Sequence, residues 1–230
     1  MMTALAIAGL AVSPAFAGTI DITLDESNTG NYWWTRYQYS GGNDTQSGFV
    51  YGDGDGLVFS QRNYQYYGGA DRWFEERAIY IQISLSALGG VSPEDILSAT
   101  FNFYVAENSS DTDVTWLRHL TTQGTAPTGD ASQQLAGDAN VISSAGLTLG
   151  WNSIYVTDFI LSDLDKGCDW AVFSILSFNQ EQDFNRILSI YGGGAADSFR
   201  PYLSVVLIPE PATGLLALAG VALLLRRKRR

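Results

Sequence analysis

The chain offers few side chains for catalysis, because it contains a single histidine, His119, and a single cysteine, Cys168. One histidine excludes metal sites built from several histidines and allows at most one serine- or cysteine-based triad. His119 falls in the alternating run Val114–Leu120, which is typical of a β-strand, and we interpret it as a structural residue at the surface or partly buried. No motif around Cys168 predicts that this histidine lies beside it, so the role of Cys168 stays open. We expect no catalytic residues and no enzyme activity.

Paired carboxylates are the other candidate catalytic groups, because most glycosidases place two carboxyl groups around the glycosidic bond that they break. The sequence contains 24 acidic residues, among which Glu75 and Glu76 are adjacent. Neighbouring residues of a strand point to opposite faces, so these two cannot converge on one substrate. A secreted polysaccharide-active enzyme, a lyase or a glycosidase, is the alternative function and would require a cleft with two converging carboxylates.

Calcium is the metal that the sequence could hold, through Asp53 and Asp55 in the segment Asp53-Gly54-Asp55-Gly56. Carboxylates on turns are ligands that Ca²⁺ prefers. The same spacing of glycines is what a tight hairpin turn requires, so a plain turn explains the segment equally. We expect no cofactor other than this candidate structural Ca²⁺, and a calcium-dependent adhesin is a further alternative.

Aromatic residues are concentrated among Asn, Gln, Ser and Gly in the first part of the chain. Sugar rings can stack on Tyr and Trp while neighbouring polar groups bind the hydroxyls, so this composition suits contact with a glycan. Aromatic stripes also pack sheets internally or pair across strands, and that alternative stays open. The candidate glycan platform consists of Trp33, Trp34, Tyr37, Tyr64, Tyr66 and Trp73.

Period-two alternation of apolar and polar residues predicts the elements that would position these side chains. About nine or ten strands separated by turn residues indicate an all-β fold, a single antiparallel β-sandwich of the jelly-roll type. Short helices are predicted at 92–95 and 157–166, and more weakly at 130–136. The clearest strands are expected at 20–24, 57–61, 79–85, 99–105, 114–120, 151–156, 170–178, 186–191 and 202–208.

The C-terminal segment 209–230 has the pattern of a membrane-targeting signal. Pro209-Glu210-Pro211 precedes an uncharged apolar run, 212–225, and five cations end the chain: Arg226, Arg227, Lys228, Arg229 and Arg230. Lys and Arg resist translocation, so this tail is expected in the cytoplasm, after a short transmembrane helix. As a helix the apolar run would span roughly 21 Å, against about 30 Å of hydrocarbon. Such a weak anchor, behind a proline-rich segment that must stay extended, suits a peptide presented for cleavage.

The N-terminal segment 1–17 has the pattern of a secretory signal peptide. Residues 4–12 are apolar, and Ala15-Phe16-Ala17 before Gly18 has the small-x-small form of a signal-peptidase site, with Ala15 and Ala17 as its small residues. The first three residues carry no cation, which leaves the true start codon open. We expect export by the Sec route and a single folded domain over 18–208.

The charge balance excludes a nucleic-acid partner. The chain carries 13 Lys and Arg against 24 Asp and Glu, and without the five terminal cations and Glu210 the counts are 8 and 23, a net charge of −15. Such an acidic domain repels nucleic acids and anionic lipid headgroups.

Two resemblances follow from these motifs. The order of Pro209-Glu210-Pro211, apolar run and Arg cluster resembles the PEP-CTERM sorting signal, which exosortases read in Gram-negative bacteria that make exopolysaccharide. It implies an exosortase-like processing enzyme as partner, a precursor anchored transiently in the inner membrane, and delivery to the cell surface or a biofilm matrix. The exported domain resembles DNRLRE-type carbohydrate-binding-like sandwiches, which implies extracellular polysaccharide as a candidate partner. The segments that carry this second resemblance are Arg77–Leu85, Ile96–Val105, Trp151–Thr157 and Arg200–Leu203.

Overall fold

The computed structural model describes residues 18–25, 27, 29–39, 42–51, 56–68, 71–108, 114–120, 142–144, 147–178 and 185–208. The predicted signal peptide, the predicted helix at 130–136 and the C-terminal segment 209–230 lie outside these ranges. Within them, no helix combines the length and apolar character needed to cross a bilayer.

Strands dominate the described chain and only one α-helix accompanies them there, which confirms the all-β class. The helical elements are the 3₁₀ turns η2 (Leu85–Leu88) and η3 (Pro93–Asp95) and the α-helix α2 (Thr157–Asp165). The strands are β1 (Thr19–Thr23), β2 (Thr29–Tyr39), β3 (Gly42–Tyr51), β4 (Leu57–Gly68), β5 (Asp71–Ser84), β6 (Ile96–Asn108), β7 (Val114–Leu120), β8 (Ile142–Ser144), β9 (Gly150–Tyr155), β10 (Trp170–Phe178), β11 (Asn185–Tyr191) and β12 (Tyr202–Leu207).

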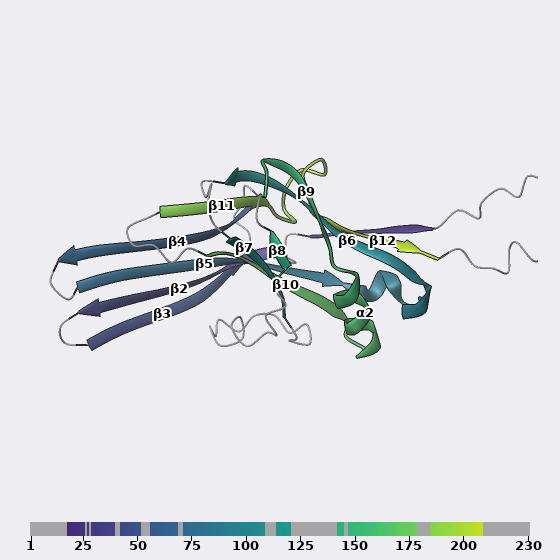
Figure 1. Ribbon diagram of the computed structural model, residues 1–230, viewed down its shortest axis with the longest axis horizontal. Helices are drawn as coiled ribbons and strands as arrows, with labels where there is room; N and C mark the ends of the chain where they lie inside the picture. The colour runs from purple at the N-terminus through teal and green to yellow at the C-terminus, as the bar shows by residue number, and fades with distance from the viewer. Residues whose placement is uncertain are drawn as a thin grey trace, which may run out of the picture.

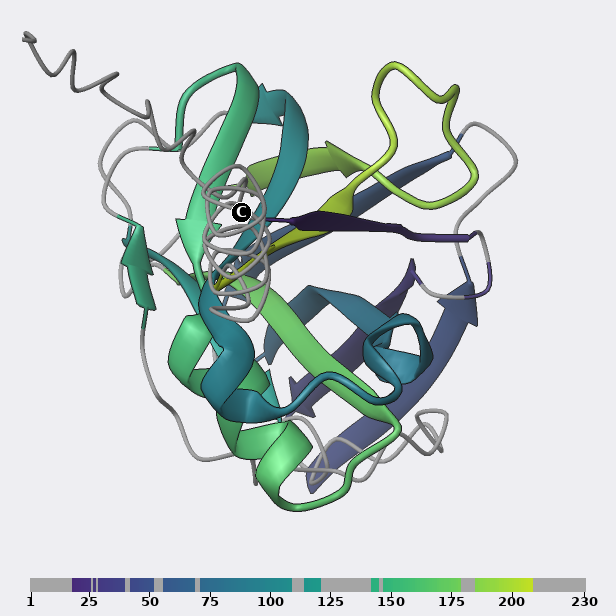
Figure 2. The same ribbon diagram turned by 90° about the vertical axis from the view of Figure 1, so that its right-hand side faces the viewer.

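All twelve strands belong to one hydrogen-bonded sheet with antiparallel pairing. Its order is β1-β12-β6-β11-β4-β5-β10-β7-β8, with β9 paired to β6 and the β2–β3 hairpin paired to β5. Figure 1 shows β3, β2, β5 and β4 side by side as long ribbons. Figure 2 looks along the molecule and shows the strands curving around the interior.

Two long strands make this continuity possible by changing partners along their length. One edge of β5 pairs with β4 up to Arg77 and with β10 from Ile79 onward, while its other edge pairs with β2. Similarly, β6 pairs with β12 near its start and with β11 near its end, opposite β9. Each of these two strands therefore has different neighbours at its two ends, and the sheet has two halves that are joined through β5 and β6.

The core lies between these halves. Phe101 and Phe103 of β6 stack at 5.3 Å between ring centroids, and Phe101 stacks on Phe173 of β10 at 6.2 Å. All three side chains are fully buried. Because β6 and β10 are not neighbours in the strand order, this contact requires the sheet to fold over itself. Alternate residues of β5, namely Ile79, Ile81 and Ile83, belong to the same buried cluster.

The predicted elements agree with the structure where alternation is strong. Strands β7 and β10 have the predicted bounds, and the helices predicted at 92–95 and 157–166 correspond to η3 and α2. The helix α2 is followed by Gly167 at φ 68°, a left-handed conformation that glycine adopts without strain. Three strands were not predicted, β2, β3 and β8, and Leu85 begins a 3₁₀ turn where a strand was expected to continue.

Candidate functional site

The outward surface of β9, β6 and β12 carries exposed aromatic side chains. Trp151 and Tyr155 on β9 are 45% and 77% exposed, whereas most aromatic rings of a folded domain are largely buried. Trp151 pairs in register with Tyr104 of β6, and Tyr202 of β12 pairs with Asn102, two residues before Tyr104. Paired residues of antiparallel strands lie on the same side of the sheet. We call Trp151, Tyr155, Tyr104 and Tyr202 the aromatic face.

This face is opposite the core because of the alternation of β6. Phe101, Phe103 and Val105 are buried in the interior, so Asn102 and Tyr104 must point outward. The same alternation on β9 places Trp151, Ser153 and Tyr155 outward and exposed. The sequence of both strands thus dictates which residues form the surface.

Contacts between rings hold the aromatic face in place. Tyr104 meets Trp151 edge-on at 5.8 Å between centroids, and Trp151 meets Tyr202 at 5.7 Å. Tyr104 also contacts Phe199 at 4.9 Å, and Phe199 stacks on Tyr191 at 4.8 Å. Each such pair contributes about 0.5–1.5 kcal/mol beyond burial, so Trp151, Tyr104 and Tyr202 have a supported orientation before any ligand arrives.

Polar groups lie among the rings. The Ser153 hydroxyl donates to Asn102 Oδ1 at 2.6 Å, and Asn102 Nδ2 donates to the Thr100 carbonyl at 3.1 Å. These side chains and the four aromatic ones are all uncharged. Trp151 and Tyr155 are four residues apart on one strand, which separates them by roughly 13 Å. A surface of this kind can stack the apolar faces of sugar rings and bond their hydroxyls along an extended neutral chain.

The platform predicted from sequence lies elsewhere, on β2, β4 and β5. Tyr37 and Trp73 pair in register, with ring centroids 6.4 Å apart, and Tyr37 stacks on the exposed Tyr39 at 5.7 Å. In the pairing of β2 with β5, Trp33 lies opposite Arg77 and Trp34 opposite Glu76, and in the pairing of β4 with β5, Tyr64 lies opposite Phe74 and Tyr66 opposite Arg72. The glycan platform at Trp33, Trp34, Tyr37, Tyr64, Tyr66 and Trp73 stays a prediction.

The predicted calcium ligands Asp53 and Asp55 fall outside the described residues. Gly56, which follows them, has φ 69°, and a Cβ atom there would lie 2.6 Å from the backbone nitrogen of Ala195. Glycine is therefore required at this position for packing and conformation, as the plain-turn interpretation expects. Over the part of the chain that the structure describes, no group of three or more His, Cys, Asp or Glu residues could hold a metal ion.

His119 is buried, with 3% exposure, and its Nε2 lies 2.8 Å from Oδ2 of the equally buried Asp163 in α2. The imidazole ring packs between Phe159 and Phe173, at 4.8 and 5.4 Å between centroids. A pair enclosed in this way joins β7 to α2 and is closed to a substrate. The interpretation of His119 as structural agrees with this geometry, but the expectation of a surface or partly buried position is wrong, because the ring is enclosed between α2 and β10.

Cys168 lies near that pair and is half-buried. Its backbone N–H donates to the Asp163 carbonyl at 2.9 Å. Partial burial, followed by the negative charge of Asp163, raises the pKa of the Cys168 thiol above its usual value. The thiol is accordingly protonated at neutral pH, which is the unreactive form.

Sequence reasoning did not single out the aromatic face, although it quoted the strand that carries Trp151 and Tyr155. The available signal was the alternation of Trp151, Ser153 and Tyr155 with less exposed residues, which fixes a common side for them. Which side faces solvent depends on β6, a strand far away in sequence. A comparison of the chain with models of known protein families gives no match, and a comparison with curated proteins also gives none.

Proposed function

We propose that this protein is an exported component of the cell surface or extracellular matrix that binds polysaccharide without chemically altering it. The proposed fold is a single sandwich of the jelly-roll type, formed by the sheet as it folds over the Phe101–Phe173 contact. Its partners are an exosortase-like processing enzyme, the inner membrane during transit, and extracellular glycan, with no nucleic acid.

Export and sorting rest on the two ends of the sequence. The signal-peptide pattern at 1–17 supports Sec export, and Pro209-Glu210-Pro211 with the apolar run and the Arg-rich end supports a PEP-CTERM signal. A precursor held in the inner membrane would be cut at this signal and passed to the cell surface or matrix.

The aromatic face carries the glycan part of the proposal. Two of its rings are exposed, Tyr104 contacts Phe199 and Tyr191, and neutral hydroxyl and amide groups lie beside the rings. Charged ligands gain little from such a surface, whereas the alternating apolar and polar character of a sugar ring matches it. Because the face lies along open strands, it suits an extended chain, and it lacks the pair of converging carboxylates that hydrolysis of a glycosidic bond uses.

Retention on insoluble neutral polysaccharides, such as cellulose and chitin, tests this proposal. The full chain, purified in detergent, should be retained, and Trp151→Ala combined with Tyr155→Ala should weaken retention by about 5- to 100-fold through the loss of two stacking contacts. Leu149→Ala is the matched control, because Leu149 is 67% exposed and lies two residues before Trp151. The release of new reducing or unsaturated ends would instead favour the enzyme alternative.

Two outcomes would contradict a site on the aromatic face. If the double variant is retained as well as the parent, the face does not bind glycan. If Trp73→Ala alone loses retention, binding takes place on β2–β5, at the platform predicted from sequence.

A further inference from the structure

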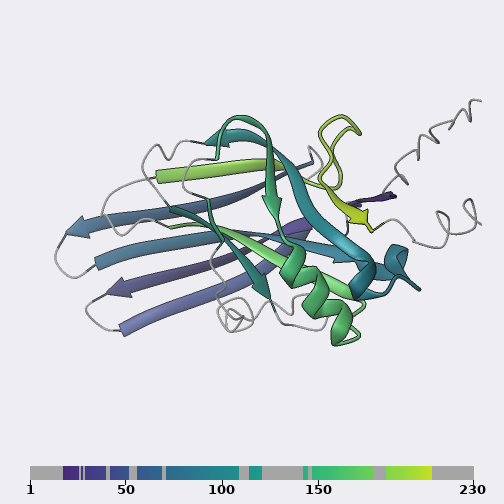
Figure 3. The same ribbon diagram turned by 45° about the vertical axis from the view of Figure 1, so that its right-hand side comes forward.

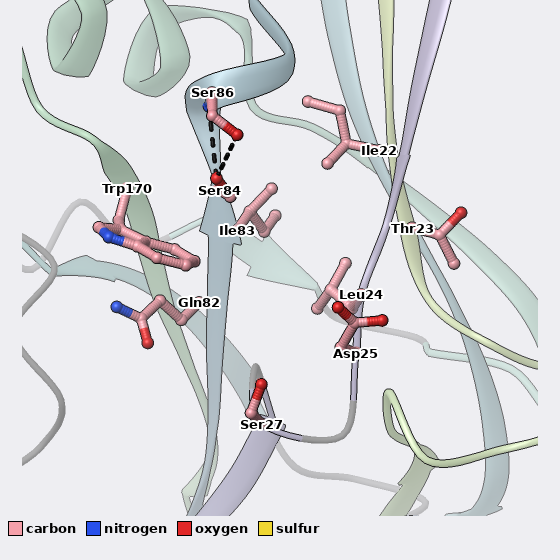
Figure 4. A pocket seen from close by; sticks show the side chains of 10 residues that line it. All are labelled: Ile22, Thr23, Leu24, Asp25, Ser27, Gln82, Ile83, Ser84, Ser86 and Trp170. Atoms are coloured by element: carbon pink, nitrogen blue, oxygen red, sulfur yellow. Dashed lines mark hydrogen bonds between the residues drawn. The ribbon is translucent and has the colours of Figure 1, made fainter.

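A polar pocket of about 360 Å³ lies between β1, the end of β5 and the beginning of β10. Its lining includes the indole of Trp170, the amide of Gln82, the carboxylate of Asp25 and the hydroxyls of Ser27 and Ser84. Figure 4 shows Trp170 and Gln82 on one side of β5, with Leu24 and Asp25 across the gap on the segment of β1 and its continuation. The volume falls within the range of small-molecule sites in proteins.

The pocket exists because strand pairing stops on both sides of it. The pairing of β2 with β5 ends at Thr29 and Ile81, and no described strand continues along that edge of β5 beyond Ile81. On the opposite side, β1 pairs with β12 and has no second partner among the described strands. The gap between these two edges is therefore a consequence of the topology and not of one loop conformation.

The walls of the pocket combine an apolar surface with fixed polar groups. Leu24 and Ile83 are each 1% exposed and close the pocket from behind, whereas the partly buried Trp170, which packs against the cluster of Tyr80, Leu120 and Val172, supplies apolar surface. On the polar side, Gln82 is 7% exposed, and the hydroxyls of Ser84 and Ser86 lie 2.8 Å apart. One indole with several hydroxyl, amide and carboxylate groups matches a ligand that has an apolar face and a ring of hydroxyls.

Charge narrows the class of ligand. Of the described residues that line the pocket, Asp25 alone is ionisable, and its negative charge disfavours anions. A carboxylate is a strong acceptor for hydroxyl donors, and hydrogen bonds to charged groups are stronger than neutral ones. These features select a neutral polyhydroxylated ring over an acidic sugar or a phosphate.

The pocket adjoins the aromatic face. Thr23, which lines the pocket, pairs in register with Tyr202, a member of that face, so the two side chains are neighbours across β1 and β12. From β9 to β1 the surface crosses three strand spacings, which is roughly 14 Å. A sugar chain lying across β9, β6 and β12 would thus reach the pocket at the edge of the sheet.

We infer that this pocket binds one neutral pyranose residue, the terminal residue of a glycan whose chain lies on the aromatic face. The connection to the chain rests on the proposed function, whereas binding of a single sugar does not. Trp170 would stack against the ring, and Asp25, Ser27 and Gln82 would bind its hydroxyls.

Calorimetric titration of the full chain with methyl glycosides of glucose, galactose, mannose and N-acetylglucosamine tests the pocket directly. At least one should bind, methyl glucuronide should bind more weakly, and Trp170→Ala should weaken binding about tenfold or more, while Trp170→Phe retains most of it. Because Trp170 also packs internally, the exposed residues Asp25 and Ser27 provide Asp25→Asn and Ser27→Ala, which should each weaken binding severalfold. Asp21→Asn, an exposed carboxylate of β1 outside the lining, should change nothing.

The results separate the two proposals. If no glycoside binds, or if Trp170→Ala and Asp25→Asn both bind like the parent, the pocket inference is wrong, whatever the polysaccharide result. If the glycosides bind and the Trp151→Ala, Tyr155→Ala variant still retains polysaccharide fully, the proposed function of the aromatic face fails while the pocket stands.

Discussion

At the scale of single residues, His119 and Asp163 form a buried polar pair that joins β7 to α2. Both side chains are at most 5% exposed and lie 2.8 Å apart. Asp163→Ala should lower the free energy of unfolding by about 1–3 kcal/mol, because His119 then loses its partner inside the protein. Asp163→Asn keeps an acceptor and should cost less. Urea unfolding followed by circular dichroism measures the difference.

Asp165 provides the control for this prediction, because it belongs to the same helix and is exposed. Asp165→Ala should change stability by no more than about 0.5 kcal/mol. Equal unfolding midpoints for Asp163→Ala and Asp165→Ala would show that the buried pair contributes nothing to stability.

For single residues, the sequence predicted the structural role of His119 but not the residue with which it pairs. The alternation of Val114–Leu120 was sufficient to interpret His119 as a structural residue. Its partner could not be identified, because Asp163 lies 44 residues away on another element. Trp151 and Tyr155 illustrate the same limit, since their exposure depends on which side of β6 faces the core.

At the scale of elements, one hydroxyl contributes to the junction of β6, β9 and α2, beside the backbone hydrogen bond from Val156 to Ala99. Figure 3 shows the green helix α2 directly after β9. At this point the Ala99 N–H donates to Thr157 Oγ1 at 2.9 Å, and the same hydroxyl donates to the Ala99 carbonyl at 3.3 Å. Thr157 therefore continues the β9–β6 pairing into the first turn of the helix.

Thr157→Val should destabilise the fold by about 1–3 kcal/mol, because it keeps the shape of the side chain but leaves the Ala99 N–H of a fully buried residue without an acceptor. Thr157→Ser restores the hydroxyl and should remain close to the parent. Thermal unfolding of the three proteins decides the matter, and equal stability of the Val and Ser variants would rule out a role for the hydroxyl.

Element prediction worked where a strand is strongly apolar. In β10 the consecutive residues Ala171, Val172 and Phe173 are all fully buried, so both faces of the strand are covered, and its bounds were predicted correctly. In contrast, β3 begins Gly42-Asn43-Asp44, residue types that are depleted in strands. The hairpin β2–β3 is extended because β2 pairs along β5 from Gln38 back to Thr29. The hairpin is thus stabilised by pairing with β5, and the sequence of β3 itself does not predict a strand.

At the scale of the whole molecule, the sequence was sufficient for the all-β class but not for the strand order. Strand β4 lies between β5, its neighbour in sequence, and β11, which follows more than 110 residues later along the chain. Pairings of this kind have no local signal, because each strand edge could accept any partner of similar length. The sequence also carries no signal for the change of partners along β5 and β6. This change links the two halves of the sheet and leaves the pocket at the edge of β1.

Delivery of the whole molecule is predicted to depend on Pro209-Glu210-Pro211. Two prolines in three residues disfavour a helix, so we expect this segment to be presented in an extended form that a processing enzyme can bind. In a host with an exosortase, replacement of all three residues by Ala should leave the protein at its precursor mass and in the inner membrane, as read by mass spectrometry and cell fractionation. Thr213→Ala, two residues after this motif, is the control and should be processed like the parent. If the triple-alanine protein reaches the cell surface at the mature mass of the parent, the motif is not a sorting signal, and the C-terminal segment would be an ordinary membrane anchor.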